Sequence, residues 1–274
     1  WFYSLLAMAT VMDGTPPFLE NFGYAMLLGA DGRAMHKSWG NAIEFNEAAA
    51  IMGVDTMRWL FSTHKPENDL LFGYEAGDQV RKDFLIPLWN VYSFFVTYAR
   101  LDGWQPGNNT GSAFDPNYPE GPTPQSDSLL DKWILARLNR LVELAGNNIS
   151  ASDFMSASQA AEAFLDDLSN WYVRRSRRRF WKSEMGQDKL AAYQTLWECL
   201  VTVSKLMAPM APFTAEEVYR NLCSGLAGYE ESVHLTMYPQ AGAGLLDYRD
   251  EMLEARMDLV RRIVFLGRSM RNEA

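Results

Sequence analysis

The chain has 274 residues, of which 48% are hydrophobic and 22% are charged, a balance that is typical of a folded protein of one or two domains and excludes a disordered one. Its net charge of −9 makes the surface as a whole repel nucleic acid, so any such binding needs a local basic patch. Two cysteines, no Cys/His cluster with metal-ligand spacing, and no apolar run near roughly 18 residues predict a cytoplasmic protein with no metal site and no membrane partner. Nothing in the sequence suggests an obligate partner, so we expect a monomer.

The first forty residues combine an apolar helix with a tight turn. Residues 1–12 are uniformly apolar and predict a buried helix that ends in the turn Asp13–Pro17, but they lack the basic leader of a signal peptide. Phe22–Leu28 predicts a short strand. Asp31-Gly32 is a strong hairpin signal, and the returning limb leads into a polar, glycine-bracketed loop at Arg33–Asn41. Both ends of the sequence are typical of a piece cut from a longer protein.

The next segment is predicted to be helical with one long loop. Glu44–Phe61 has helical apolar spacing that breaks at Gly53, and a second helical run extends from about Tyr74 to Arg100. Pro87 in this run predicts a kink or a first turn. Leu101–Gln125 is dense in Gly, Pro, Asn and Ser, so we expect a surface loop there.

The second half has the apolar stripes of an antiparallel helical bundle. Helices are expected from a capping box at Ser128 to Gly146, from Phe154 through Trp181, over Asp188–Met207, and onward from a second capping box at Thr214–Glu217. A short strand at Ser232–Tyr238 and a charged amphipathic helix over Tyr248–Ala274 complete the prediction.

Five arginines occupy the six positions from 174 to 179. At 100° per residue, Arg174, Arg177 and Arg178 fall on one stripe of a helix. Guanidinium groups bind phosphates in a bidentate manner and stack on exposed bases, so we expect this stripe to contact RNA. Arg175 and Arg179 lie further round the helix. For these two, pairing with bundle carboxylates is the expected role, with candidates at Glu162, Asp166 and Asp167.

The polar loop carries one lysine, Lys37, which on physical grounds alone is most simply a solvated surface residue. The run Met35-His36-Lys37-Ser38-Trp39-Gly40-Asn41 changes this, because together with Asp55 and Met57-Arg58-Trp59 it resembles the Lys-Met-Ser-Lys-Ser signature loop of class I aminoacyl-tRNA synthetases. The resemblance implies that Met35, His36, Lys37 and Ser38 form an ATP-binding loop. It also implies that Lys37 is catalytic and stabilises charge on the phosphates while the aminoacyl-adenylate forms.

This loop departs from the signature at two positions. Ala34 stands where the signature has its first lysine, and His36 stands where it has a serine. One cation directed at the phosphates is therefore missing. His36 or Arg33 could partly replace it.

A second resemblance covers the bundle. The segment Leu168–Trp181, supported by Asp131–Leu135, Ala208–Phe213 and Ser232–Leu235, resembles the anticodon-binding domain of isoleucyl-tRNA synthetases, which are class Ia enzymes. The resemblance implies tRNA as the partner and ATP, with Mg, and isoleucine as substrates of the intact enzyme. The tRNA-binding residues it implies are Asn170, Trp171, Arg174, Arg177 and Arg178.

Together these patterns predict a mainly α protein, in which an antiparallel bundle follows the C-terminal edge of a Rossmann-like α/β catalytic domain. The expected boundaries are 1–43 for the α/β part, 44–76 for a stem-contact connection, 77–240 for the anticodon-binding domain and 241–274 for the start of a C-terminal extension. The function that the resemblance implies is that of a portion of an isoleucine-specific aminoacyl-tRNA ligase, a portion that is expected to be inactive by itself. Valyl- and leucyl-tRNA synthetases, and a non-catalytic helical RNA-binding module, remain as alternatives.

Overall fold

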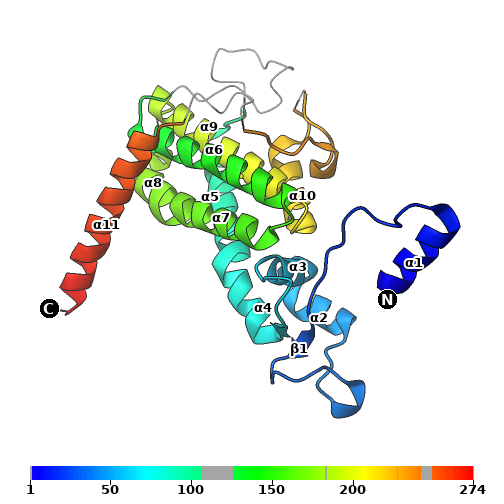
Figure 1. Cartoon of the computed structure of the whole chain (residues 1–274). Coiled ribbons are helices and arrows are strands. Elements are labelled where there is room, and N and C mark those ends of the chain that lie inside the picture. The colour runs from blue at the N-terminus through cyan, green and yellow to red at the C-terminus, as the bar shows by residue number, and fades with distance from the viewer. Residues whose placement is uncertain (1, 107–125, 183, 227, 242–248, 274) are drawn as a thin grey trace.

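The computed structural model describes residues 2–106, 126–182, 184–226, 228–241 and 249–273 (Figure 1). The loop predicted at Leu101–Gln125 lies mostly outside the described residues, and α5 continues to Asp102. The N-terminal part contains α1 (Phe2–Asp13), β1 (Leu27–Gly29), η1 (Lys37–Trp39), α2 (Phe45–Met52), α3 (Val54–Ser62), β2 (Leu70–Phe72) and α4 (Tyr74–Val80). The bundle and its extension contain η2 (Arg81–Leu85), α5 (Ile86–Asp102), α6 (Leu129–Ser150), α7 (Phe154–Asp166), η3 (Asp167–Val173), α8 (Arg174–Trp181), α9 (Gln187–Met207), α10 (Pro212–Cys223), η4 (Val233–Leu235) and α11 (Glu251–Glu273).

Helix α1 forms where the sequence predicts it, but the prediction that it is buried was wrong. None of its residues is buried, and Figure 1 shows it standing apart from the other helices at the end of an extended segment. Its apolar residues surround the helix and do not form one stripe, so the sequence specifies a helix without specifying a face for a neighbour.

Strand β1 has a different partner from the one expected. It pairs in parallel with β2, with Leu27 opposite Leu70 and Gly29 opposite Phe72, whereas the predicted hairpin is reduced to one antiparallel bridge between Leu28 and Ala34. The hairpin turn itself is confirmed, since the Gly32 N–H donates to the Gly29 carbonyl at 2.9 Å and Gly32 has φ of 75°. Strand β2 was not predicted because its three residues are too few to show the alternation of apolar and polar side chains that indicates a strand.

Two short helices separated by Gly53 follow, as predicted. Gly53 has φ of 85°, a left-handed conformation that favours glycine, and it ends α2 and begins α3. The run from Tyr74 is also helical as predicted, and Pro87 lies in the first turn of α5. The π-helical turn η2 immediately precedes it and accommodates the proline without ending the helix.

The bundle encloses the main core. Helix α6 packs against both α7 and α9, and α9 packs in turn against α10 and α5 (Figure 1). Aromatic side chains fill the interior, and the largest ones that are fully buried are Trp59, Trp133, Trp197, Tyr172, Tyr193, Tyr219, Phe84 and Phe180. The expected fold class is therefore confirmed: a mainly helical chain in which a bundle follows a small α/β unit.

Helix α6 begins directly after Ser128, as predicted, but three other details predicted for the bundle were wrong. Helix α6 continues past Gly146 to Ser150, and the chain turns at Ser152 in a left-handed conformation with φ of 58°, so an interior glycine was mistaken for a helix end. The Ser128 side chain makes no capping bond. The segment 232–238 contains the 3-10 turn η4 at Val233–Leu235 and no strand, because the Glu216 carboxylate accepts the Val233 N–H at 2.9 Å and folds the segment back onto α10.

Both cysteines are buried in this core. Cys199 and Cys223 are free thiols with 0% and 1% exposure. Burial raises the pKa of Cys199 well above its ordinary value and raises the pKa of Cys223 to about 12. Neither thiol therefore ionises near neutral pH.

No helix in the described part of the chain combines the length and the apolar character needed to cross a lipid bilayer.

Candidate functional site

The arginine run lies on α8, and its side chains separate as the helical phase predicts. Arg174, Arg177 and Arg178 are exposed, while Ser176 and Phe180 of the same helix are buried. None of these three arginines has an ion pair within the described residues. We call them the arginine stripe; it is a set of unneutralised cations on one face of a helix, in a protein whose net charge is negative.

Arg179 instead points into the bundle, as a structural role requires. Its Nη1 and Nη2 lie 2.5 and 2.7 Å from the two carboxylate oxygens of Asp131 on α6, which is 0% exposed. Its Nε lies 2.9 Å from Asp188. The Tyr172 hydroxyl donates to Asp131 at 2.9 Å and the Ser126 hydroxyl at 2.5 Å, so the buried carboxylate is fully surrounded by donors.

Burial alone lowers the pKa of Arg179, but the hydrogen bonds and negative charge of Asp131 outweigh this effect and raise its pKa overall. Arg179 is therefore a permanent cation of the core.

Pairing with carboxylates was predicted for Arg175 and Arg179; it is found for Arg179, with other carboxylates than those predicted, and it was wrong for Arg175. Asp167 accepts from Arg137 at 2.8 Å and also pairs with Arg261, which reaches Asp166 at 3.2 Å. Glu162 accepts the indole N–H of Trp59 at 2.9 Å. Arg137 on α6 and Arg261 on α11, which pair with Asp166 and Asp167, are too distant in sequence for the phase of one helix to identify them as partners.

Arg175 has no carboxylate partner among the described residues and lies against an aromatic ring. Its guanidinium carbon is 3.6 Å from the centre of the Trp171 ring, a cation–π contact. Trp171 is 9% exposed, and the Asn170 amide donates to Asp166 at 2.6 Å. Asn170 is exposed beside the arginine stripe, and Trp171 acts there chiefly as the support for Arg175.

The Asn41 side chain fixes the backbone of the polar loop. The Asn41 side chain accepts the His36 N–H at 2.9 Å and donates to the Ala34 carbonyl at 3.1 Å, while Gly40 takes a left-handed conformation with φ of 71°. Met35 turns inward and packs on the small core around Met52 and Phe72. His36, Lys37 and Ser38 are exposed, and the His36 ring packs on Trp39 at 4.3 Å.

Within the described residues the Lys37 ammonium has no carboxylate partner. The loop therefore presents a free cation on a backbone that is fixed by the Gly40-Asn41 pair.

Helix α3 connects the N-terminal part, which carries the polar loop, to the bundle. This role was not predicted from the sequence. The Asp55 carboxylate accepts the backbone N–H groups of Phe213 at 3.3 Å and Thr214 at 2.5 Å, and so caps α10 from another helix. This arrangement replaces the capping box predicted at Thr214. Arg58, one turn later, donates to the carbonyls of Met210 at 3.2 Å and Pro209 at 2.7 Å.

Replacing Asp55 with Ala is expected to lower the free energy of unfolding by about 2 kcal/mol, because the α10 N–H groups lose a buried charged acceptor. Urea unfolding followed by tryptophan fluorescence measures this change. The matched control is Asp78→Ala, which removes an exposed carboxylate paired with Arg81 and should change stability by less than about 0.5 kcal/mol. Equal losses for the two variants would contradict the capping role.

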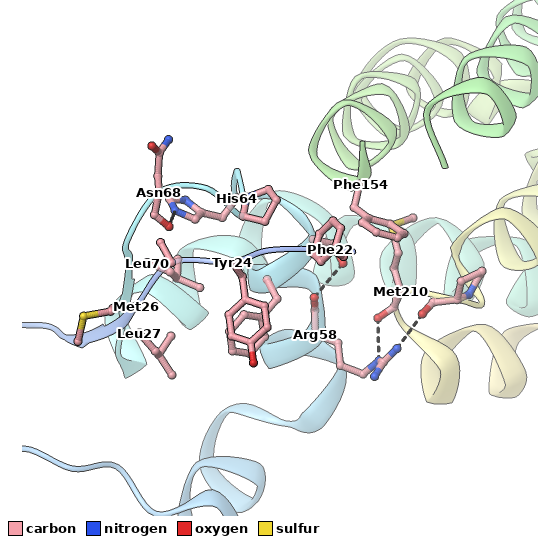
Figure 2. A pocket seen from close by; sticks show the side chains of 15 residues that line it. Phe22, Tyr24, Met26, Leu27, Arg58, His64, Asn68, Leu70, Phe154 and Met210 are labelled. Atoms are coloured by element: carbon pink, nitrogen blue, oxygen red, sulfur yellow. Dashed lines mark hydrogen bonds between the residues drawn. The ribbon is translucent and has the colours of Figure 1, made fainter. Parts of the chain in front are cut away.

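A largely apolar cavity of about 540 Å³ lies at this junction (Figure 2). The extended segment 22–27 forms one side, the end of α3 another, and Phe154 with Met210 from the bundle a third. Figure 2 shows the Arg58 side chain crossing from α3 to the carbonyls of the bundle at one edge of the cavity. The segment is fixed by the Ala25 N–H, which donates to the Pro66 carbonyl at 2.7 Å.

In the described part of the chain, no three His, Cys, Asp or Glu side chains lie close enough together to hold a metal ion.

Comparisons with known proteins match both ends of the chain. The family described as anticodon-binding domain of tRNA ligase matches residues 131–274, and the family described as tRNA synthetases class I (I, L, M and V) matches residues 1–72. An isoleucine–tRNA ligase of Dehalococcoides mccartyi is 43% identical over 276 residues, covering 100% of this chain and 26% of that protein. One from Clostridium novyi is 39% identical, covering 100% of this chain and 25% of that protein. The chain thus spans about a quarter of the length of these relatives.

Solved structures share the fold. The leucyl enzyme of Agrobacterium radiobacter in a ternary complex with tRNA superposes with a TM-score of 0.62 at 14% identity, covering 89% of this chain and 27% of that one. Methionyl-tRNA synthetase of Mycobacterium tuberculosis gives a TM-score of 0.54 at 21% identity, covering 70% of this chain and 36% of that one.

Proposed function

Because the tRNA ligase family matches more than half of this chain, the chain belongs to that family, and we propose that it forms the signature-loop and tRNA-binding part of an isoleucine–tRNA ligase. The whole enzyme would join isoleucine to ATP, releasing pyrophosphate, and then transfer the aminoacyl group from the adenylate to tRNA. The sequence contains no His-Ile-Gly-His motif, so we expect the chain alone to bind RNA without catalysing this reaction.

Isoleucine is favoured over valine and leucine because the relatives compared above are named as isoleucine enzymes, with identities of 39–43% over the whole chain. A non-catalytic RNA-binding module is the less favoured alternative, since the synthetase family also matches the region that holds Lys37. We keep the boundaries 1–43, 44–76, 77–240 and 241–274 as proposals. Residues on both sides of 43 share the small core around Met52, so the first two parts would move as one unit.

The arginine stripe carries the proposal for tRNA. Its three guanidinium groups are exposed and unpaired within the described residues, whereas the neighbouring Arg179 is neutralised by Asp131. Because the protein as a whole is acidic, leaving three cations unpaired on one helix face favours a polyanionic partner.

Changing Arg174, Arg177 and Arg178 together to Gln is expected to weaken binding of an isoleucine tRNA anticodon stem–loop. The slope of log K against log salt should become shallower by about 2, since each phosphate contact contributes about 0.7 to 0.9. Fluorescence anisotropy across a salt series measures the slope. An isoleucine tRNA and a valine tRNA are compared in parallel.

The matched control carries the same charge change at the exposed arginines Arg100, Arg220 and Arg256, which belong to other helices than α8. The control should leave the slope of log K against log salt within about 0.3 of the value for the unchanged chain. Removing charges outside the contact surface removes no phosphate contact, and their long-range effect is screened by salt. If both triple variants lower the slope equally, the stripe is not the binding surface.

The loop fits a phosphate group. Lys37 supplies an exposed cation without a carboxylate partner among the described residues, and Gly40 and Asn41 fix the backbone that carries it. We therefore propose that Lys37 contacts the phosphates of ATP, together with Met35, His36 and Ser38 of the same loop. Magnesium as the companion of ATP, a monomeric state and a cytoplasmic location remain predictions from the sequence.

A further inference from the structure

A cavity of about 450 Å³ opens between α9, α10 and the segment 228–240. Lys205 lines it from α9 and Tyr219 from α10. The segment adds four aromatic or aliphatic side chains, those of Tyr229, Leu235, Met237 and Tyr238. The lining residues include none of the arginine stripe or of the polar loop, and Figure 1 shows the segment that follows α10 on the side of the bundle opposite α11. The cavity is therefore separate from both surfaces of the proposed function.

Hydrogen bonds to both helices hold this segment in place. The Glu216 carboxylate on α10 accepts from the Ser232 hydroxyl and from the Val233 N–H, each at 2.9 Å. The Tyr238 hydroxyl donates to the Leu206 carbonyl of α9 at 3.4 Å. Because the segment is attached to α9 as well as to α10, the cavity between them is a fixed feature of the bundle.

Lys205 is a buried cation without a counter-ion. It is 9% exposed, and since it lines the cavity, the part that stays exposed faces this space. Within the described residues it forms no ion pair and no hydrogen bond. Cys223 on α10 supplies no negative charge, since burial raises the pKa of that thiol to about 12 although the positive charge of Lys205 lowers it in part.

A second buried lysine of α9 shows how such a charge is ordinarily satisfied. Lys189 is 2% exposed, and its ammonium lies 2.5 Å from the Asp102 carboxylate and 2.5 Å from the Lys182 carbonyl. Removing an ammonium from water costs free energy unless an anion or other acceptors replace the water. Lys205 has only the favourable dipole of the α9 C-terminus, so an anion from outside the chain would complete its surroundings.

The lining residues select an anion with one charge and an apolar body. Lys205 is the only basic side chain among the described lining residues, and Glu230 lines the same cavity. A polyanion would therefore meet one cation and one repelling carboxylate. The aromatic and aliphatic walls offer apolar contact instead, and a cavity of several hundred Å³ has the size of small-molecule sites.

We propose that this cavity binds a small organic monocarboxylate, with the carboxylate on the Lys205 ammonium and the apolar body between Tyr229, Met237 and Tyr238. The site is additional to those for tRNA and ATP and does not depend on them. Binding joins the segment 228–240 to α9 through the ligand and so stabilises the folded chain.

The probe is 4-phenylbutyrate, and its control is 4-phenylbutyramide, which has the same size and no charge. Saturation-transfer NMR titrations on the complete chain measure both. We expect a dissociation constant of about 1 mM for the carboxylate, which is in the range for a ligand of this size. The amide should bind at least about tenfold more weakly, because it loses the charge-assisted hydrogen bond. Acetate and inorganic phosphate, which lack the apolar body, should not displace the probe.

Variants of Lys205 test the cation. Lys205→Met should weaken binding of 4-phenylbutyrate about tenfold, whereas Lys205→Arg keeps the charge and should bind it within about threefold of the unchanged chain. The matched control is Lys132→Met, which removes an exposed lysine of α6 outside the cavity and should leave binding unchanged.

Thermal unfolding without the probe separates an unpaired lysine from a structural one. Lys205→Met should raise Tm by about 2–4 °C because it removes a buried charge that has no partner. Lys189→Met should lower Tm by more than about 4 °C because it leaves the Asp102 carboxylate without its cation. Adding 4-phenylbutyrate at about ten times its dissociation constant should raise the Tm of the unchanged chain by about 3 °C and leave that of Lys205→Met unchanged.

Four results would each overturn the proposal: no binding of 4-phenylbutyrate, equal affinity for the carboxylate and the amide, unchanged binding in Lys205→Met, or a Tm that falls as far in Lys205→Met as in Lys189→Met. Displacement of the probe by inorganic phosphate would contradict the assignment to monocarboxylates. Binding of the stem–loop RNA by Lys205→Met should equal that of the unchanged chain, so failure of this proposal leaves the proposed function intact.

Discussion

Replacing Arg179 with Met is expected to lower the free energy of unfolding by about 3–5 kcal/mol, the cost of leaving a buried charge without its partner. Asp131 is 0% exposed and receives two hydrogen bonds from Arg179, and the Tyr172 hydroxyl and Ser126 hydroxyl cannot neutralise its charge. Methionine fills part of the space but supplies no donor. Urea unfolding followed by circular dichroism measures the loss.

The neighbouring Arg178→Met provides the control. It makes the same substitution one residue earlier on the same helix, where the side chain is exposed and has no ion pair within the described residues, so stability should change by less than about 0.5 kcal/mol. The double variant Asp131→Asn/Arg179→Met should be more stable than Arg179→Met alone, because it removes the orphaned charge. If it is less stable than Arg179→Met, the explanation by an unpaired charge is incorrect.

Replacing Lys37 with Ala in the intact enzyme that contains this chain is expected to slow ATP–pyrophosphate exchange by about 10²–10³-fold. The reason is that one preorganised cation facing the developing phosphate charge has an effect of this size. Because Ala34 stands where the signature has its first lysine, Lys37 has less support from a second cation and its loss should be felt fully. Isotope exchange between pyrophosphate and ATP measures the rate.

Lys65→Ala is the matched control, since it removes an exposed lysine of the same unit outside the loop. It should leave exchange within about twofold. Binding of the stem–loop RNA to the chain should not respond to Lys37→Ala, because the loop and α8 lie in different parts of the molecule (Figure 1). An unchanged exchange rate in the Lys37 variant would contradict the proposed role of Lys37 in adenylate formation.

The arginine stripe could be predicted because its phase is local. Arg174, Arg177 and Arg178 lie within two turns of regular helix, where 100° per residue holds. The π-helical turn η3 immediately before them changes the number of residues per turn, so angular positions counted from α7 at 100° per residue would not have applied to α8. The loop was also predictable, since Gly40 and Asn41 act on residues only a few positions away.

What could not be predicted depends on pairs far apart in sequence. Asp131 and Arg179 are separated by 48 positions, and Asp55 and Thr214 by 159. A carboxylate has the same signature in sequence whether it caps a distant helix or faces water, so Asp55 and Asp131 carried no sign of their roles. The apolar residues of α1 likewise gave a helix but no neighbour, because periodicity identifies a face and α1 has none.

Because both native thiols are buried, spectroscopic labels can be attached to introduced cysteines without labelling the native ones. Cys199 and Cys223 are inaccessible and their pKa values are raised by burial, so maleimide reagents will pass them over at neutral pH. A pair of cysteines introduced at Ser38 and at Trp181, an exposed residue of α8 outside the arginine stripe, can then carry spin labels without any change to the native sequence elsewhere. The span from loop to arginine helix becomes directly measurable, free and with RNA bound.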